Sequence, residues 1–332
     1  MARPTLFILN PASAAGSTGR RVEALRRRVE ASLGPVDLQA TCAPGEATRL
    51  ARAASEAGVE RILVGGGDGT TSEVVAGVLE AAALRGSSPT PVLGLLPLGS
   101  GLDLMRSLGL PRALGPALDV IAEGSVRTID AGRIELRDPA GRPVSRAFVN
   151  EASLGLSGET VMRVGRTSKR IGPRLGFVAG AVGAILGHRP VDVAVEVDGS
   201  RVFEGPVSLL VAANGRFFGA GMRVAPGAVL DDGRLELVLV RGLSMPRLLV
   251  NLPSFYLGRH GRHPNVSFRA VRSVVVLPKE GSAPVEVDGE AVGGLPMRAE
   301  VVPGAIRVHA RVEDAAGSSL SRGAADGQGV ER

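Results

Sequence analysis

The chain has 332 residues, enough for two domains of ordinary size, and 44% of them are hydrophobic, so each domain can bury a core of its own. Aromatic residues make up 3% and tryptophan is absent, which leaves few stacking platforms for bases and argues against a nucleic-acid partner despite the net charge of +6. Because the single cysteine, Cys42, excludes an intramolecular disulfide, we expect a reducing, cytoplasmic setting.

Residues 1–128 alternate short apolar strands with amphipathic helices. The expected strands are TLFILN, VDLQAT, RILV and VLGLL, and the expected helices span 17–33, 46–57, about 71–84 and 112–123. This alternation predicts an α/β domain with a doubly wound parallel sheet. Ligands of such sheets bind at the carboxyl ends of the strands.

The third strand runs directly into a glycine-rich turn, in the sequence RILVGGGDGTTSE at 61–73. Glycines let the backbone approach a ligand closely, and the N–H groups of such a turn, with those of the following helix, bind phosphate. Asp68 would repel a phosphate unless a cation lies between them, which indicates magnesium. The expected nucleotide contacts are Gly66, Gly67, Asp68, Gly69, Thr70, Thr71 and Ser72. The alternative is a glycine-rich turn of an ordinary α/β domain without a ligand.

A second strand, turn and helix, VLGLLPLGSGLD at 92–103, repeats this layout, with Ser100 in the turn and Asp103 at the start of the helix. Because parallel strands end at the same edge of a sheet, both turns can face one cleft.

Other phosphate-binding designs are missing from the chain. Lys169 and Lys279 are the only lysines and neither follows a glycine-rich turn, so there is no P-loop, and there is no V-A-I-K or H-R-D kinase signature. The dinucleotide pattern G-x-G-x-x-G starts at Gly65 but has Thr70 in place of its last glycine. A Rossmann dehydrogenase is therefore disfavoured.

Residues 129–313 change to short alternating strands separated by Gly, Pro and Asp-Gly turns, which predicts an antiparallel, β-sandwich-like second domain. Helical interruptions are expected around 156–166 and 245–257. The last residues, 314–332, are rich in Gly, Ala and Ser and predict a disordered tail.

The sequence GGGDGTTSE, followed by LPLGSGLDLMRSLGLP, resembles the catalytic domain of the diacylglycerol kinase family, which includes bacterial diacylglycerol kinases and the related sphingosine and ceramide kinases. The resemblance covers most of the chain. It implies the two-domain fold shared by NAD kinases and diacylglycerol kinases, and an ATP-dependent transfer of the γ-phosphoryl group to a hydroxyl of a diacylglycerol-like or sphingoid-like lipid, with magnesium. The implied catalytic residues are Glu290, Asp68 and Asp103.

Two Asp-Gly turns of the second half gain roles from this resemblance. The DGE turn of VEVDGEAV at 285–292 carries Glu290, the implied general base, whereas the similar hairpin VEVDGSRV at 195–202 has Ser200 there. In VLDDGRLEL, the resemblance implies a structural magnesium held by the Asp232 side chain and the Val229 and Arg234 carbonyls. The alternative is an Asp-Gly turn without metal.

The resemblance also implies nucleotide contacts by Asn10 and Thr41, at the ends of the first two strands. Asn150, and the segment ANGRFFGAGMRVAPGA at 213–228, resemble further polar elements of the family. Ser100 keeps a hydroxyl usually supplied by threonine. Leu102 departs from the family's usual asparagine, and leucine lacks that side chain's polar contacts.

Three alternatives stay open at this point. An NAD kinase-like phosphotransferase shares the GGDG turn, and a catalytically silent nucleotide- or lipid-binding protein fits the departure at Leu102. The basic loop at 163–174 can touch an anionic membrane surface from the cytoplasm or be a plain solvated loop. It lies beside an apolar stretch at 175–187, which is too short to span a bilayer.

Overall fold

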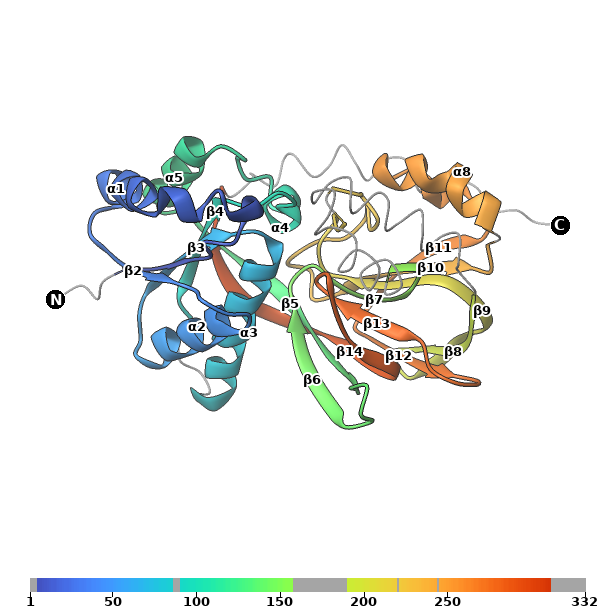
Figure 1. The fold of residues 1–332 in the computed structure, drawn as a ribbon. Coiled ribbons are helices and arrows are strands. Elements are labelled where there is room, and N and C mark those ends of the chain that lie inside the picture. Colours follow the sequence, from blue (N-terminus) through green and yellow to red (C-terminus); the bar gives the residue numbers. More distant parts are fainter. Residues whose placement is uncertain (1–4, 86–89, 158–189, 220, 244, 312–332) are drawn as a thin grey trace.

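The computed structural model describes residues 5–85, 90–157, 190–219, 221–243 and 245–311 (Figure 1). The basic loop at 163–174, the apolar stretch at 175–187, most of the helix expected at 156–166 and the tail at 314–332 lie outside these residues. No helix in the described part of the chain is long and apolar enough to cross a membrane.

The first half is built on four strands that pair in parallel. Their order in the sheet is β2 (Val36–Ala40), β1 (Thr5–Leu9), β3 (Arg61–Gly66) and β4 (Val92–Pro97). Successive residues of β1 point to opposite faces, so Leu6 and Ile8 belong to one buried cluster and Phe7 and Leu9 to another. Helices α2 (Glu46–Glu56) and α3 (Asp68–Arg85) cover the first cluster, whereas α1 (Val22–Leu33) and α5 (Leu114–Glu123) cover the second.

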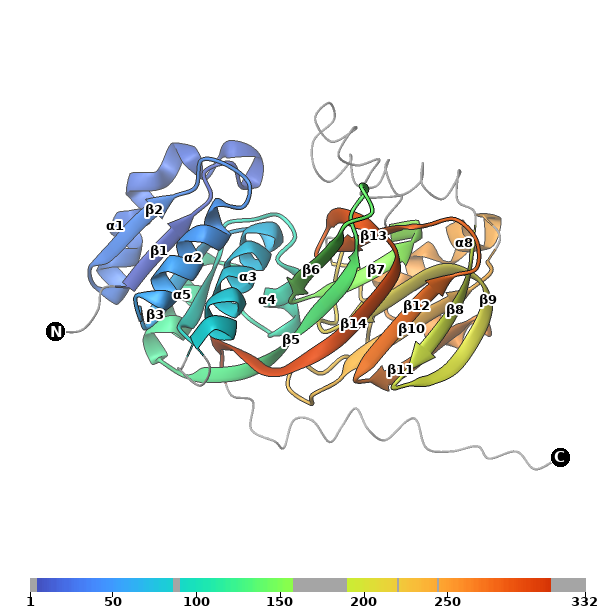
Figure 2. The ribbon, with the colours of Figure 1, turned by 90° about the horizontal axis from the view of Figure 1, so that it is seen from below.

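The second half is mostly antiparallel β-structure, as expected (Figure 2). Its strands are β6 (Pro143–Phe148), β7 (Glu151–Gly155), β8 (Val191–Val197), β9 (Ser200–Ala213), β10 (Leu235–Arg241), β11 (Val266–Val271), β12 (Ser273–Pro278) and β13 (Pro284–Val287). Valine, leucine and alanine side chains at alternate positions of these strands point inward and form an aliphatic core. The helix expected at 245–257 is present as α8 (Met245–Tyr256), and its Phe255 packs on β9 and β10 in a separate cluster.

Two long strands join the halves into one continuous sheet. Strand β14 (Glu290–His309) starts in the second half and reaches the first, where Arg307 and Val308 pair in parallel with the start of β4. Its antiparallel partner β5 (Val126–Arg137) contains the boundary expected at residue 128. The division into a nucleotide-binding half and a lipid-binding half stays a prediction, because these strands belong to both.

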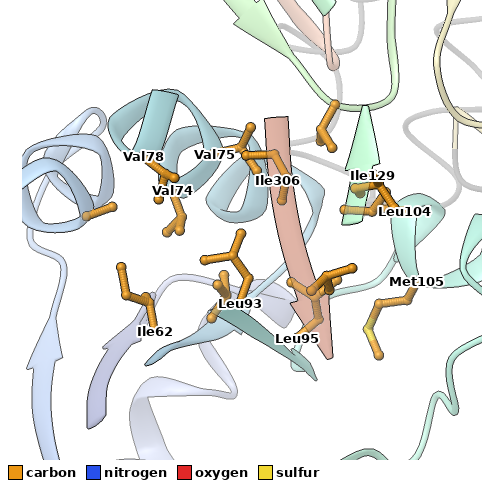
Figure 3. Close-up of a cluster of buried hydrophobic side chains, with 14 of the residues drawn as sticks. Ile62, Val74, Val75, Val78, Leu93, Leu95, Leu104, Met105, Ile129 and Ile306 are labelled. Atoms are coloured by element: carbon orange, nitrogen blue, oxygen red, sulfur yellow. The ribbon is translucent and has the colours of Figure 1, made fainter. Parts of the chain in front are cut away.

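The short helix α4 (Asp103–Ser107) is anchored in the core of the first half. Leu104 and Met105 pack in the same buried cluster as Leu95 of β4, Ile129 of β5 and Ile306 of β14 (Figure 3). This packing fixes the start of α4, and with it Asp103, at the junction of the two halves.

Candidate active site

The two glycine-rich turns touch each other, backbone against backbone. A Cβ atom added at Gly99 would overlap the Cα atom of Gly67 and lie 3.1 Å from the carbonyl oxygen of Gly66. One added at Gly67 would lie 3.5 Å from the Cα atom of Gly99. Gly99 is therefore needed for this approach, which places the carboxyl ends of β3 and β4 and the first turn of α3 side by side.

Asp68 connects the two turns by capping α4. Its Oδ1 atom accepts the N–H of Asp103 at 2.6 Å and that of Leu104 at 3.4 Å, two donors that a helix start leaves unpaired. A Cβ at Gly101 would overlap the other oxygen, Oδ2, and lie 3.9 Å from Oδ2 of Asp103. One oxygen of Asp68 is thus committed to the backbone, and the other faces the second turn beside Asp103.

The charge of Asp68 is costly at this position. Burial raises the pKa of the Asp68 carboxyl, and the backbone N–H groups of Asp103, Leu104 and Leu102 oppose the rise. A cation beside Oδ2 would favour the charged form further. The site suits magnesium, which binds through one or two carboxylates together with substrate phosphates and water.

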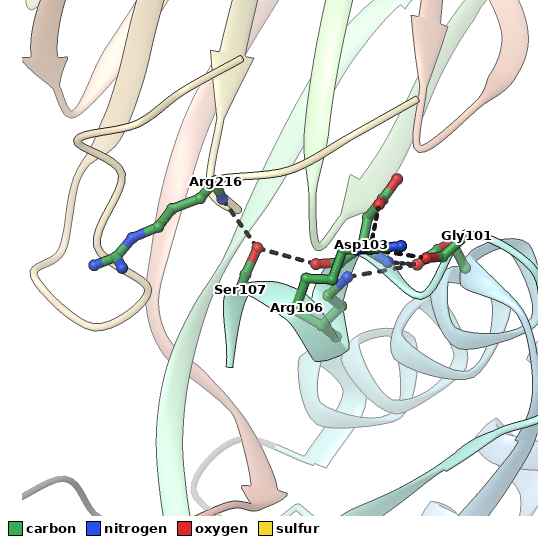
Figure 4. A network of polar contacts seen from close by, with 7 residues as sticks. Gly101, Asp103, Arg106, Ser107 and Arg216 are labelled. Carbon is green, nitrogen blue, oxygen red and sulfur yellow. Dashed lines mark hydrogen bonds and ion pairs between the residues drawn. The ribbon is translucent and has the colours of Figure 1, made fainter. Parts of the chain in front are cut away.

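Helix α4 links the second turn to the other half of the chain (Figure 4). Asp103 is 4% exposed, and its Oδ1 atom lies 3.6 Å from Nε of Arg106, which also donates to the Gly101 carbonyl at 3.2 Å. The Ser107 hydroxyl donates to the Asp103 carbonyl at 3.1 Å and accepts the N–H of Arg216 at 3.0 Å. Arg216 belongs to the segment ANGRFFGAGMRVAPGA, so this segment contacts the end of α4.

Leu102 adopts a left-handed backbone conformation at the N-terminus of α4, with φ 60° and ψ 43°. Asparagine tolerates this conformation and leucine does so poorly. The leucine side chain is 8% exposed and packs in the core of the first half. A strained backbone is therefore combined with a buried apolar side chain at the position where the family usually has asparagine.

Replacing Leu102 with asparagine tests which of these two effects is larger. Relief of the left-handed strain recovers about 1–2 kcal/mol, whereas loss of the buried leucine costs about 1.5–3 kcal/mol. We expect Leu102→Asn to lower the free energy of unfolding by about 1 kcal/mol, measured by urea denaturation. An increase would show that the strain outweighs the packing.

The DGE turn from the second half is docked on the first glycine turn. Asp288 and Gly289, with φ 46° and 87°, form the tight turn between β13 and β14. The Asp288 carboxylate accepts N–H groups at 2.9–3.0 Å from Val149, Asn150 and Glu151. Burial raises the pKa of the Asp288 carboxyl, and the Ser72 side chain, in the first turn of α3, opposes the rise. The turn is therefore held by its own domain and lies next to the helix that follows the glycines.

Glu290 lies next to this contact, between α3 and β6. Burial raises the pKa of the Glu290 carboxyl, the like charges of Glu73 and Asp288 raise it further, and Arg146 of β6 lowers it. A raised pKa brings a carboxylate closer to the range useful for a general base at neutral pH. A cavity of about 830 Å³ also has Arg146 in its wall, together with Leu79, Ala82 and Ala83 of α3 and Val302 of β14.

The expected nucleotide contacts of the first half lie at the ends of its strands. The Asn10 side-chain amide donates to the Thr70 hydroxyl at 2.9 Å, which ties the end of β1 to the first glycine turn. Thr41 follows β2, and its N–H donates to the Leu9 carbonyl at 2.8 Å. The Thr71 hydroxyl is used inside α3, where it donates to the Gly67 carbonyl at 3.1 Å. The structure thus brings Asn10 and Thr70 together, with Ser100 exposed in the second turn.

The expected structural metal site is a tight turn near the start of β10. Asp232 Oδ1 accepts the N–H of Arg234 at 3.0 Å. Burial raises the pKa of the Asp232 carboxyl, and the nearby charges of Asp130 and Asp231 add to the rise. Within the described ranges, no three His, Cys, Asp or Glu side chains are grouped to hold a metal. One carboxylate and the carbonyls of Val229 and Arg234 fit a hard cation, so this role stays a prediction.

Two buried carboxyls below the DGE turn, Glu151 and Glu286, are not predicted from the sequence. Each follows the alternation of its strand, on the face opposite the core residues Ala152 and Leu154 or Val285 and Val287. The local pattern therefore gives no signal that these two acids are buried. Asn214 is also buried, and its side-chain amide donates to the carbonyls of Asp130 and Val149.

Known families and proteins match the chain along most of its length. The diacylglycerol kinase catalytic domain matches residues 4–134, and the YegS C-terminal NAD kinase beta sandwich-like domain matches 151–310. A protein of Chromohalobacter salexigens named "Probable lipid kinase YegS-like" is 33% identical over 79% of each chain. A diacylglycerol kinase of Staphylococcus carnosus is 30% identical over 89% of this chain and 91% of its own.

Solved structures show the same fold. A crystal structure of a diacylglycerol kinase from Bacillus anthracis superposes with a TM-score of 0.67, covering 93% of this chain and 97% of the other. The two sequences are 19% identical, so this likeness concerns the fold alone.

Proposed function

The chain belongs to the diacylglycerol kinase family of lipid kinases, and from this premise we propose that it transfers the γ-phosphoryl group of ATP to a hydroxyl of a diacylglycerol-like or sphingoid-like lipid, with magnesium. One observation carries the proposal. The DGE turn with Glu290 lies beside the first turn of the helix that follows the glycines, where Ser72 affects the pKa of the Asp288 carboxyl and Glu73 affects that of the Glu290 carboxyl. This position supports a role for Glu290 close to the phosphates.

In this proposal the nucleotide lies across the two glycine turns. The N–H groups at the start of α3 supply hydrogen-bond donors and the positive end of the helix dipole to the phosphates. Asn10 and Thr70, joined at 2.9 Å, supply polar groups at the neighbouring strand end, and Thr41 and Ser100 are further candidates. Asp68 and Asp103 would hold magnesium, which neutralises charge on the phosphates when bound.

Glu290 accepts the proton of the attacking lipid hydroxyl. The hydroxyl oxygen forms a bond to the γ-phosphorus while the bond to the β-bridging oxygen breaks, and ADP leaves. The 830 Å³ cavity shares Arg146 with the surroundings of Glu290, and its wall combines the apolar side chains of Leu79 and Val302 with charged side chains such as Glu80 and Glu135. Positioning and charge neutralisation provide most of the rate.

A labelled-ATP assay tests the function. The protein is incubated with γ-labelled ATP, magnesium and one acceptor at a time: diacylglycerol vesicles, a sphingoid base, NAD, or none. We expect label on a lipid, no label on NAD, and no transfer when magnesium is chelated. Label on NAD would establish an NAD kinase-like enzyme instead. Tight ATP binding without lipid-dependent ADP release would establish a catalytically silent binding protein.

A further inference from the structure

Glu151 of β7 and Glu286 of β13 are buried side by side beneath the DGE turn. Each is 1% exposed. The two strands are antiparallel neighbours in which Glu286 lies opposite Ser153, so Glu286 and Glu151 project from the same face of the sheet. The two carboxyl groups are close enough that each affects the pKa of the other.

The contacts show which of the two carries a proton. Glu286 accepts the Ser153 hydroxyl at 2.6 Å on Oε1 and the N–H of Gly289 at 3.1 Å on Oε2, as a carboxylate does. Glu151 leaves Oε2 without a hydrogen-bond partner among the described residues. An unpartnered oxygen costs less on a neutral acid than on a buried carboxylate. Glu151 is thus the acid, and its O–H donates to Glu286.

The energetics agree with this assignment. Burial raises the pKa of the Glu151 carboxyl well above its usual range, and the neighbouring Glu286 and Asp288 carboxyls raise it further. Two carboxylates in contact away from water cannot both stay charged.

This pair holds the backbone of the turn that carries Glu290. The Glu286 carboxylate accepts the N–H of Gly289, and the backbone carbonyl of Glu151 accepts the N–H of Asp288 at 3.0 Å. Both turn residues have a left-handed backbone conformation. Glu286 therefore fixes the residue immediately before Glu290.

The hairpin VEVDGSRV provides an internal comparison. Asp198 and Gly199 form the same turn, with φ 50° and 83°. Glu196, which corresponds to Glu286, instead forms an ion pair at 3.3 Å with Arg201, a side chain that is 53% exposed. A turn of this sequence consequently forms without a buried carboxyl pair. Formation of the turn alone therefore does not explain the pair beneath the DGE turn.

We propose that Glu151 and Glu286 share one proton and act as positioning residues that hold the DGE turn, so that Glu290 faces the nucleotide phosphates. The proposal rests on the lipid kinase function for its kinetic readout. The shared proton has a readout of its own.

Two isosteric variants separate the roles of the pair. Glu151→Gln keeps an N–H donor toward Glu286, so we expect kcat to change by less than about twofold. Glu286→Gln leaves one acceptor oxygen for the three donors, which are Ser153, Gly289 and Glu151, and turns an amide group toward one of them. Small misplacements of catalytic groups have large effects on the rate, so kcat should fall about 10-fold or more while the Kd for ATP stays unchanged. Glu196→Gln, at the comparison hairpin, should leave kcat unchanged. Equal kcat in Glu151→Gln and Glu286→Gln would overturn the proposal.

Infrared spectroscopy tests the shared proton without any assay of activity. The difference between the spectra of the native protein and Glu151→Gln at neutral pH should contain the C=O band of a buried protonated carboxyl. Taking the difference removes the bands of other buried carboxyls, such as Glu236, whose pKa burial raises to about 7. Absence of the band from the difference spectrum would overturn the assignment even if Glu286→Gln fails to fold. Failure of the native protein to phosphorylate any lipid would refute the proposed function and leave this measurement valid.

Discussion

Replacing Glu290 with glutamine is expected to lower kcat by about 10²–10⁴-fold and to leave the Kd for magnesium-ATP within about twofold, because general-base catalysis contributes on this scale and glutamine cannot take up a proton. The amide keeps the size of the side chain, so the DGE turn, which is held through Asp288, should stay in place. Steady-state kinetics with labelled ATP and isothermal titration calorimetry measure the two quantities separately.

Glu280→Gln is the matched control, since Glu280 is an exposed carboxylate in the loop before β13. It should keep both kcat and ATP affinity. If Glu290→Gln loses nucleotide affinity and turnover in equal measure, Glu290 is a structural residue of the turn rather than the base.

The pH dependence of kcat has a sign that follows from the surroundings of Glu290. Its raised pKa means that the base becomes deprotonated at higher pH than an ordinary glutamate. The kcat of the native protein should therefore rise with pH, and the rise should occur at higher pH values than the usual pKa of glutamate predicts. The residual activity of Glu290→Gln should lack this rise.

Local sequence patterns predict the elements of the first half because each strand and helix has its own hydrophobic period. The helix expected at 46–57 is present as α2, Glu46–Glu56. The helix expected from residue 17 starts as an α-helix only at Val22, after two 3₁₀ turns. Gly16 has a positive φ and Gly19 packs closely on the Pro11 carbonyl, so the backbone there follows tertiary contacts instead of helical periodicity.

Pairing between distant segments is what sequence patterns do not encode. Nothing local in β14 shows that Arg307 and Val308 extend the sheet of the first half beside β4. The expectation that Asp68 faces a cation likewise takes no account of its second role, the cap on α4, because that role depends on where Asp103 lies in space. The carboxyl pair below the DGE turn is hidden for the same reason: each acid looks like an exposed strand residue until its partner is known.

The contact between the two glycine turns makes Gly99→Ala a substitution that we expect to disrupt the proposed nucleotide site. The added Cβ would overlap the Cα of Gly67 and crowd the carbonyl oxygen of Gly66, which are backbone atoms that no rotamer change can move. Overpacking of this kind costs about 1–3 kcal/mol of folding stability. The turns would have to separate, so the affinity for ATP should fall about 10-fold or more, since about 1.4 kcal/mol corresponds to a factor of ten.

Gly115→Ala is the control for this prediction, because a Cβ at Gly115 in α5 would meet only the Arg28 side chain, at 3.6 Å, an ordinary contact. Alanine there should leave ATP affinity unchanged and raise stability by about 0.4–1 kcal/mol. Urea denaturation and calorimetric ATP titration of both variants supply the comparison. If a folded Gly99→Ala protein kept native ATP affinity, phosphate binding would not depend on the close approach of the two turns. The nucleotide would then have to bind elsewhere than at their junction.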